Sequence, residues 1–88
     1  MGSTLKVYGT DSCGDCRRAK QYFDTNEIAY DWVDVEASPD EIETVMSYND
    51  GRKTIPVIVF PDGSHLTEPS NAELAAKLTA DAFPQARR

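Results

Sequence analysis

The sequence predicts a single α/β domain, residues 1–88 with a core from about 4 to 83, in which helices cover both faces of a four-stranded mixed sheet. The chain has 88 residues, enough for one modest hydrophobic core. Short apolar runs alternate with segments of helical spacing, and Asp62-Gly63 between the last two runs signals a tight hairpin. Because a tight turn joins antiparallel strands and a helix joins parallel ones, the order β-α-β-α-β-β-α gives a mixed sheet.

The four expected strands are runs of apolar, β-branched or aromatic residues, most of them bounded by turn signals. Their expected ranges are 5–8, 30–35, 57–60 and 64–66. The third run is entirely apolar, which predicts a central strand, whereas the last is short and is expected at an edge.

Each expected helix begins at a serine that can act as its N-cap. Ser38 is followed by Pro39 at the first helical position and by Glu41, and Ser70 is followed three residues later by Glu73, a capping-box pattern. The first helix is expected to start at Ser12, with an inner face of Cys16, Ala19, Tyr22 and Phe23. The second is expected to bury Ile42, Val45 and Met46 and to end at Asn49-Asp50-Gly51. The third is expected to bury Leu74, Ala75 and Leu78 and to end at Phe83-Pro84.

Composition and charge exclude several classes of protein. With 40% hydrophobic and 27% charged residues, the chain reads as an ordinary globular protein. No segment approaches the roughly 20 apolar residues of a membrane span, and the first residues lack the pattern of a signal peptide. A formal net charge of −6 argues against nucleic acid, since phosphate binding needs a basic face. We expect a cytoplasmic monomer that binds neither membrane nor nucleic acid.

The only two cysteines form the motif Cys13-Gly14-Asp15-Cys16. Such a pair can hold half of a zinc site, but tetrahedral zinc needs four ligands. The only other soft ligand is His65, expected on a distant edge strand and interpreted as a surface residue, so we expect no metal. A motif of this spacing at a loop–helix junction, in a chain without an export signal, indicates thiol–disulfide chemistry instead.

The position of the motif assigns a role to each sulfur. Ser12 is expected to cap the helix, which puts Cys13 in its first turn, where unpaired N–H groups and the helix dipole favour the attacking thiolate. Cys16 lies one turn deeper and is shielded, so it is expected to be the resolving thiol. Asp15 has two interpretations: it completes a capping pair with Ser12, or its carboxylate opposes thiolate formation at Cys13.

Pro56 stands at the entrance of the apolar run that begins at Val57. Proline cannot donate a ladder hydrogen bond, so the residue itself predicts only a strand start. Arg52 and Lys53, shortly before it, are either part of a solvated loop or attract an anionic thiol or an acidic protein surface.

Together, the motif Cys13-Gly14-Asp15-Cys16 after a first strand and Thr54-Ile55-Pro56 before a later hairpin resemble the glutaredoxins of the thioredoxin superfamily. The resemblance implies a thioredoxin/glutaredoxin-like fold with a cis Pro56 that faces the cysteines. It also implies that the backbone of Ile55 pairs with a bound thiol or peptide, and Thr54, Lys53 and Arg52 are expected to complete this binding segment.

Four segments are similar to the mycoredoxin-like branch of that family, which works with mycothiol. They are 28–30, 52–56, 60–64 and 66–70. This resemblance implies no tightly bound cofactor, mycothiol as the cosubstrate, and mixed disulfides of that thiol as substrates. Glutathione remains an alternative, although the loop at 66–70 lacks the Gly-Gly turn that glutathione-using members carry.

Two other functions remain open. The first is a thioredoxin-like electron donor, reduced by a flavoprotein disulfide reductase and serving ribonucleotide reductase or a peroxidase. The second is an iron–sulfur carrier that dimerises through Cys13, against which Cys16 counts because cluster-holding members usually have serine there.

Overall fold

The computed structural model describes residues 5–81 of the chain and the side chains of residues 5–78. The elements are, in chain order, β1 (Leu5–Gly9), α1 (Gly14–Thr25), β2 (Tyr30–Asp34), α2 (Glu41–Tyr48), β3 (Val57–Val59), β4 (His65–Thr67) and α3 (Asn71–Asp81). This confirms the order that the sequence predicts, with ends that differ by one or a few residues.

The four strands form one sheet in the order β2-β1-β3-β4. β1 and β2 are parallel, whereas β1 pairs with β3, and β3 with β4, in antiparallel fashion. The parallel pair is joined by α1 and the last pair by a short turn, as their connections require. The predicted mixed sheet, with the apolar run of β3 inside it and β4 at an edge, is confirmed.

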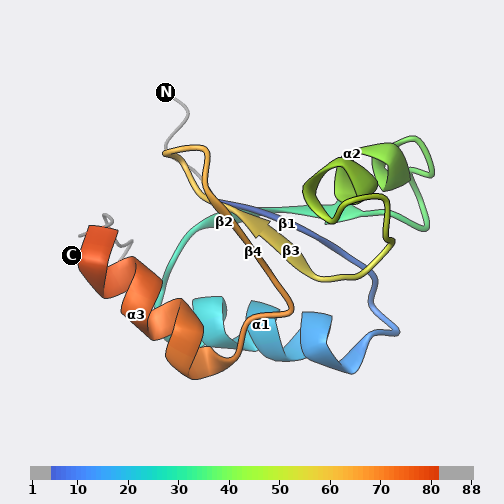
Figure 1. Cartoon of the computed structure of the whole chain (residues 1–88). Helices are drawn as coiled ribbons and strands as arrows, with labels where there is room; N and C mark the ends of the chain where they lie inside the picture. Colours follow the sequence, from blue (N-terminus) through green and yellow to red (C-terminus); the bar gives the residue numbers. More distant parts are fainter. Residues whose placement is uncertain (1–4, 82–88) are drawn as a thin grey trace.

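Helices cover both faces of the sheet, with α1 and α3 on one side and α2 on the other (Figure 1). Alternate residues of the strands supply the two cores, because successive side chains point to opposite faces. The larger core contains Leu5, Val7, Ala19, Phe23, Ile28, Ile58, Phe60, Leu74 and Leu78. The smaller one, under α2, contains Tyr8, Val35, Val45 and Val57. The carboxyl end of β1 therefore lies between two packed layers and leads directly into the cysteine motif.

The turn between β3 and β4 differs from the two-residue turn that Asp62-Gly63 suggests. Gly63 N donates to Phe60 O (2.9 Å) and Phe60 N donates to Ser64 O (2.8 Å), so three residues form the loop. Gly63 has φ +91°, the left-handed conformation that closes such a loop and that glycine adopts without a steric cost. The hairpin is confirmed and its loop is one residue longer.

The second helix begins later than its sequence signals predict. Ser38 is not its cap: Ser38 O accepts from Glu41 N (2.9 Å) and Pro39 O accepts from Ile42 N (3.0 Å), which are i→i+3 bonds of a tighter turn. The α-helix starts at Glu41 after Asp40, whose side chain makes no capping bond. A proline at the first position fixes φ but leaves the following turn free to tighten.

At α3 the predicted capping box is present. Ser70 Oγ accepts from Glu73 N (3.1 Å), and Ser70 N donates to Glu73 Oε1 (2.8 Å). The predicted helix stop at Phe83-Pro84 lies outside the described residues.

Candidate active site

The cysteine motif opens α1, but Ser12 is not the residue that caps the helix. Cys13 is the N-cap, with an extended backbone (φ −87°, ψ 121°), and its sulfur accepts from Cys16 N at 3.3 Å. Ser12 Oγ instead lies 3.3 Å from Thr10 Oγ1. A turn in which Cys13 N donates to Thr10 O (3.3 Å) sets this register, so the helix starts one residue later than the sequence suggests.

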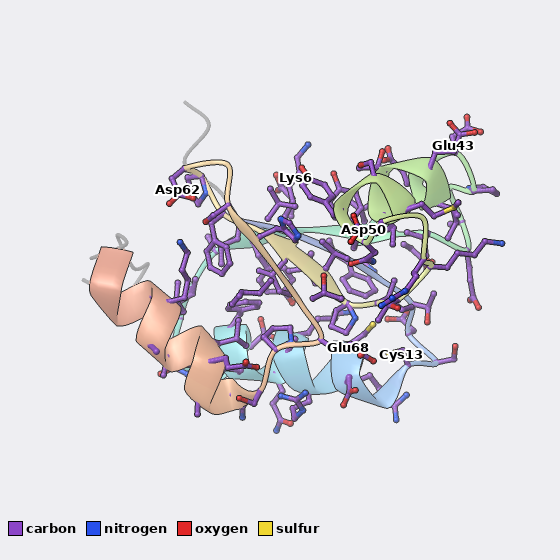
Figure 2. All side chains as sticks on the ribbon, viewed as in Figure 1. Lys6, Cys13, Glu43, Asp50, Asp62 and Glu68 are labelled. Atoms are coloured by element: carbon purple, nitrogen blue, oxygen red, sulfur yellow. The ribbon has the colours of Figure 1, made fainter. Side chains whose placement is uncertain are left out.

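The sulfur of Cys13 thus occupies the position of a capping acceptor. A backbone N–H points at it, and the positive end of the helix dipole lies beneath it. The side chain is partly exposed and is a free thiol. Figure 2 shows Cys13 at the end of α1, far from Asp62 in the hairpin turn. An accessible sulfur in such electropositive surroundings is suited to act as a nucleophile.

Cys16 has the opposite surroundings. It is fully buried (0% exposed), and burial is the main cause that raises the pKa of its thiol to about 12. A hydrogen bond with the Cys13 side chain raises the pKa further, as do the charges of Cys13 and Asp15, while a backbone hydrogen bond with Thr10 lowers it. Cys16 is therefore a protonated thiol at neutral pH, in contact with the Cys13 side chain.

Asp15 does not pair with Ser12. Its carboxylate accepts from Arg18 Nη2 at 3.3 Å, one helical turn further on. The neighbouring Arg17 donates to Asp11 O (2.9 Å) and holds the loop before the motif. The expected capping pair of Ser12 and Asp15 is wrong because Cys13 already fills the capping position.

Arg18 also joins the motif to a distant loop, which sequence reasoning missed. Its guanidinium donates to Pro69 O (3.2 Å) and to Asn71 Oδ1 (2.9 Å), at the start of α3. No local pattern could have indicated this contact, since it spans more than fifty residues.

The segment that contains Pro56 lies beside the same loop. The Ile55–Pro56 peptide bond is cis, as the resemblance implies, and Pro56 is fully buried. Pro56 O accepts from Glu68 N (2.9 Å), and Glu68 directly precedes Pro69, whose carbonyl oxygen Arg18 binds. Through this loop, the structure links the helix of the cysteine motif to the cis-proline segment.

Asn49 fixes the residues that precede the proline, a role that the sequence did not reveal. Its Nδ2 donates to Thr54 O (2.8 Å), and its Oδ1 accepts from Thr67 Oγ1 (2.6 Å) on β4. Thr54 and Ile55 are half-buried. The signal was present in part, because Asn49 stands at the predicted end of a helix.

Arg52 and Lys53 are exposed on the connection between α2 and β3. In the part of the chain that the structure describes, neither forms an ion pair. His65 is also exposed, as expected, and its ring nitrogen Nε2 lies 3.1 Å from Tyr48 O. Within the same residues, no three His, Cys, Asp or Glu side chains converge to hold a metal ion.

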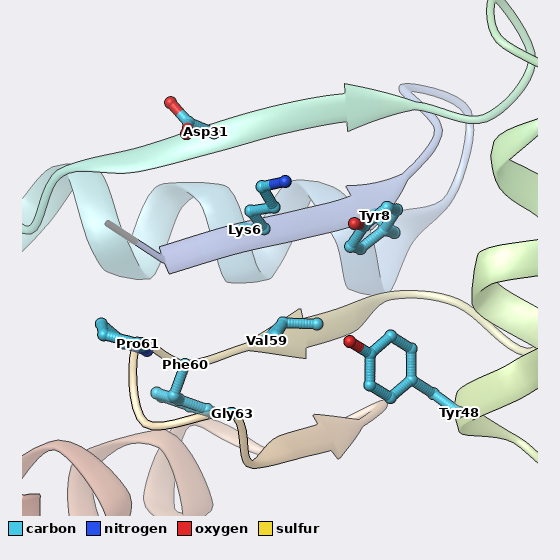
Figure 3. A pocket seen from close by; sticks show the side chains of 8 residues that line it. All are labelled: Lys6, Tyr8, Asp31, Tyr48, Val59, Phe60, Pro61 and Gly63. Atoms are coloured by element: carbon cyan, nitrogen blue, oxygen red, sulfur yellow. The ribbon is translucent and has the colours of Figure 1, made fainter. Parts of the chain in front are cut away.

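A separate cavity of about 340 Å³ lies on the side of the sheet that carries α2 (Figure 3). Its lining includes Lys6, Tyr8, Asp31 and Tyr48, and none of the predicted site residues. Burial, followed by the charges of Glu41 and Tyr48, raises the pKa of Tyr8. Of the helices described, none has the length and apolar character of a membrane span.

Comparison with solved structures identifies the fold. A crystal structure of a glutaredoxin from Archaeoglobus fulgidus superposes with a TM-score of 0.71 at 22% identity, and the match covers 84% of each chain. The arrangement of sheet and helices is thus that of a thioredoxin-like α/β protein.

The sequence comparisons identify the family. The glutaredoxin family model matches residues 5–66. "Putative glutaredoxin Rv3198A" of Mycobacterium tuberculosis (strain H37Rv) is 46% identical over 76 residues, which cover 86% of this chain and 90% of that protein. Mycoredoxin 1 of Corynebacterium glutamicum (strain ATCC 13032) is 38% identical over 78 residues, 89% of this chain and 96% of that protein. The chain belongs to the glutaredoxin family and is a thiol–disulfide oxidoreductase.

Proposed function

We propose that this protein removes mycothiol from mixed disulfides, with Cys13 as the nucleophile and Cys16 as the resolving thiol. The observation that carries the proposal is the contrast between the two sulfurs. Cys13 is partly exposed and accepts a backbone N–H, whereas Cys16 is buried as a protonated thiol. Similarity to mycoredoxin 1 supports mycothiol as the small thiol.

The first step is a thiol–disulfide exchange at Cys13. Its thiolate attacks the mycothiol sulfur of the substrate's mixed disulfide, and the substrate thiolate leaves and takes up a proton from water. Cys13 now carries mycothiol in a new S–S bond. A second mycothiol thiolate attacks the bound mycothiol sulfur, which releases Cys13 as a thiolate and yields mycothiol disulfide. In sum, the mixed disulfide and one mycothiol give the reduced substrate and mycothiol disulfide, and Cys16 is not consumed.

The same intermediate can also be resolved by Cys16. Its thiol loses a proton and attacks Cys13 Sγ, which expels the mycothiol thiolate and forms the Cys13–Cys16 disulfide. Reduction of that disulfide requires two electrons from two further mycothiols or from a flavoprotein disulfide reductase. Burial opposes loss of the Cys16 proton, so we expect this route to be slower than the monothiol route at neutral pH.

The segment around Pro56 is proposed to hold the bound thiol. The backbone of Ile55 pairs with the substrate's cysteinyl unit, and Pro56 and Thr54 shape that contact. Arg52 and Lys53 attract acidic protein substrates, since both are exposed and without ion pairs among the described residues. Mycothiol has no carboxylate, so these charges select the protein partner and not the small thiol.

The identity of the small thiol is tested with Cys16→Ser, which traps the adduct on Cys13. The variant is incubated separately with mycothiol disulfide and with glutathione disulfide, and the adduct mass is followed over time. Mycothiol should add to Cys13 at least tenfold faster. Faster addition of glutathione would overturn the mycothiol assignment while leaving Cys13 as the nucleophile. Cys13→Ser is the control and should form no adduct.

A dithiol electron donor is a second candidate, favoured by the hydrogen bond between the Cys13 and Cys16 side chains. In that role the protein would deliver electrons to ribonucleotide reductase or a peroxidase. The same Cys16→Ser variant separates the two functions. Retained removal of mycothiol supports the monothiol enzyme, and complete loss of turnover supports the donor.

The remaining proposals concern the whole molecule. We infer that residues 1–88 form one domain that acts as a cytoplasmic monomer and holds no tightly bound cofactor. Size-exclusion chromatography with light scattering tests the oligomeric state, and a mass near 9.7 kDa is expected.

A further inference from the structure

The carboxyl end of β1 contains a glycine where the Cys16 sulfur packs. A Cβ at Gly9 would collide with Cys16 Sγ, and it would lie 3.2 Å from Cys16 Cβ and 3.1 Å from Trp32 Cη2. Atoms from two elements thus fill the space that a side chain at Gly9 would need. No alanine fits there unless a neighbour moves.

The backbone does not require glycine at this position. Gly9 is not among the residues with positive φ, and it pairs with Asp34 in the regular register of β1 and β2. Gly9 O also accepts from Val35 N at 3.0 Å. Alanine can adopt this extended conformation, so the effect of a substitution is confined to the space beside Cys16.

Trp32 is held in place on the other side of this space. Lys20 Nζ lies 4.0 Å from the centre of the Trp32 ring, and the same ammonium pairs with Asp11 at 3.1 Å. The indole therefore cannot retreat without loss of its cation–π contact with Lys20. Because Cys16 Sγ is the atom nearest to the added Cβ, we expect this sulfur to move when Gly9 gains a side chain.

We propose that Gly9 is a positioning residue for Cys16: its missing side chain leaves the space in which the Cys16 sulfur lies beside Cys13, ready to close the disulfide. The inference rests on the proposed function. The step affected is the attack of the Cys16 sulfur on Cys13 Sγ, which forms the Cys13–Cys16 bond and releases the small thiol. A displacement of about 1 Å from such a geometry can slow a reaction about 100-fold.

The test measures ring closure directly. Reduced protein reacts with 5,5′-dithiobis(2-nitrobenzoate), which first attaches thionitrobenzoate to Cys13. Attack by Cys16 then releases it, and the release is followed by absorbance at 412 nm in a stopped-flow instrument. Gly9→Ala should slow this second phase at least tenfold. Lys6→Ala is the control on the same strand, since the Lys6 side chain is exposed on β1, and it should change the phase less than threefold.

A second pair of variants separates this inference from the proposed function and from general damage. Gly9→Ala in the Cys16→Ser background should remove mycothiol from a mixed disulfide at the rate of Cys16→Ser alone, because that route does not use Cys16. Ring closure in Gly9→Ala at the wild-type rate would overturn the inference, even if removal of mycothiol is normal. Failure of Cys16→Ser to react with mycothiol disulfide would overturn the proposed small thiol and leave the ring-closure result standing.

Trp32→Phe keeps the inference testable if Gly9→Ala does not fold. This variant removes the indole edge that forms the other wall of the space around Cys16. With more space around it, the Cys16 sulfur should form the disulfide with Cys13 about threefold more slowly. An unchanged rate in this variant would contradict the positioning role.

Discussion

The starts of α1 and α3 use the same hydrogen bond with different atoms. At α3, Ser70 Oγ accepts from the N–H three residues later, at 3.1 Å from Glu73 N. At α1, Cys13 Sγ accepts from the N–H three residues later, at 3.3 Å from Cys16 N. One capping acceptor is a hydroxyl, and the other is the sulfur that we propose as the nucleophile.

The two starts differ in what the third residue does. The Glu73 carboxylate accepts from Ser70 N (2.8 Å), so the N–H and the hydroxyl of the capping residue both have hydrogen-bond partners within the same turn. Cys16 instead turns its side chain inward beneath Gly9, and Cys13 N donates to the carbonyl oxygen of Thr10. A capping position can thus stabilise a helix, or it can direct a backbone donor at a reactive sulfur, depending on the atom that fills it.

Replacement of Cys13 should have the largest effect, because this residue provides both the capping acceptor of α1 and the proposed nucleophile. Cys13→Ser keeps a capping acceptor but lacks the sulfur, so turnover should fall to background while stability stays nearly constant. Cys13→Ala loses both, and it should be less stable than Cys13→Ser by about 1 kcal/mol. Urea unfolding of the reduced variants and an assay of mixed-disulfide reduction provide the two measurements. Turnover retained by Cys13→Ser would contradict the assignment of the nucleophile.

The pH dependence of stability tests whether Cys16, unlike the partly exposed Cys13, is a buried and protonated thiol. Burial, above all, raises the pKa of Cys16 to about 12 from an ordinary value of 9.0. Above pH 9 the unfolded chain releases this proton while the folded protein keeps it, so stability falls as pH rises. Reduced wild type should lose up to about 1.4 kcal/mol per pH unit more than Cys16→Ala between pH 9 and 10.

Chemical unfolding at a series of pH values measures this slope. Two raised tyrosine pKa values, of Tyr8 and Tyr30, contribute equally to both proteins and cancel in the difference. Oxidised protein, which has no Cys16 thiol, should also lack the extra slope. Equal slopes for reduced wild type and Cys16→Ala would contradict a buried, protonated Cys16.

Removal of the hydroxyl cap at α3 should affect stability alone. Ser70→Ala is expected to lower the free energy of unfolding by about 1 kcal/mol, since the N–H of Glu73 loses its acceptor. The rate of mixed-disulfide reduction should not change. Ser47→Ala is the matched control, because that hydroxyl binds Thr44 O inside α2 and serves no cap. An effect of the same size in both variants would show that the cap has no special role.

The smallest effect is expected at Asp15. Asp15→Asn removes a negative charge near Cys13, which should speed alkylation of Cys13 by iodoacetamide at pH 7 about two- to threefold, because the carboxylate opposes a thiolate. The effect is modest because the side chain is 52% exposed and pairs with Arg18. Glu43→Gln on α2 is the control and should leave the rate unchanged. A slower rate in Asp15→Asn would show that its ion pair supports the motif more than its charge opposes the thiolate.

Local sequence patterns were enough to predict the features that depend on neighbouring residues. The capping box of Ser70 and Glu73, the hairpin at Asp62-Gly63 and the spacing of the two cysteines are all local, because their partners lie within a few positions. The order of strands and helices followed from the same local patterns, and with it the mixed sheet.

Which atoms meet at the site depends on packing between segments that are distant in the sequence. Ser12 and Cys13 can both cap a helix, and the turn from Thr10 selected Cys13. The fit of Cys16 beneath Gly9 joins a helix to a strand, and Arg18 reaches a loop far along the chain at Pro69. Such contacts depend on the packing of the helices against the sheet, which no short window of sequence contains, because their free energy comes from groups brought together only when the whole core forms.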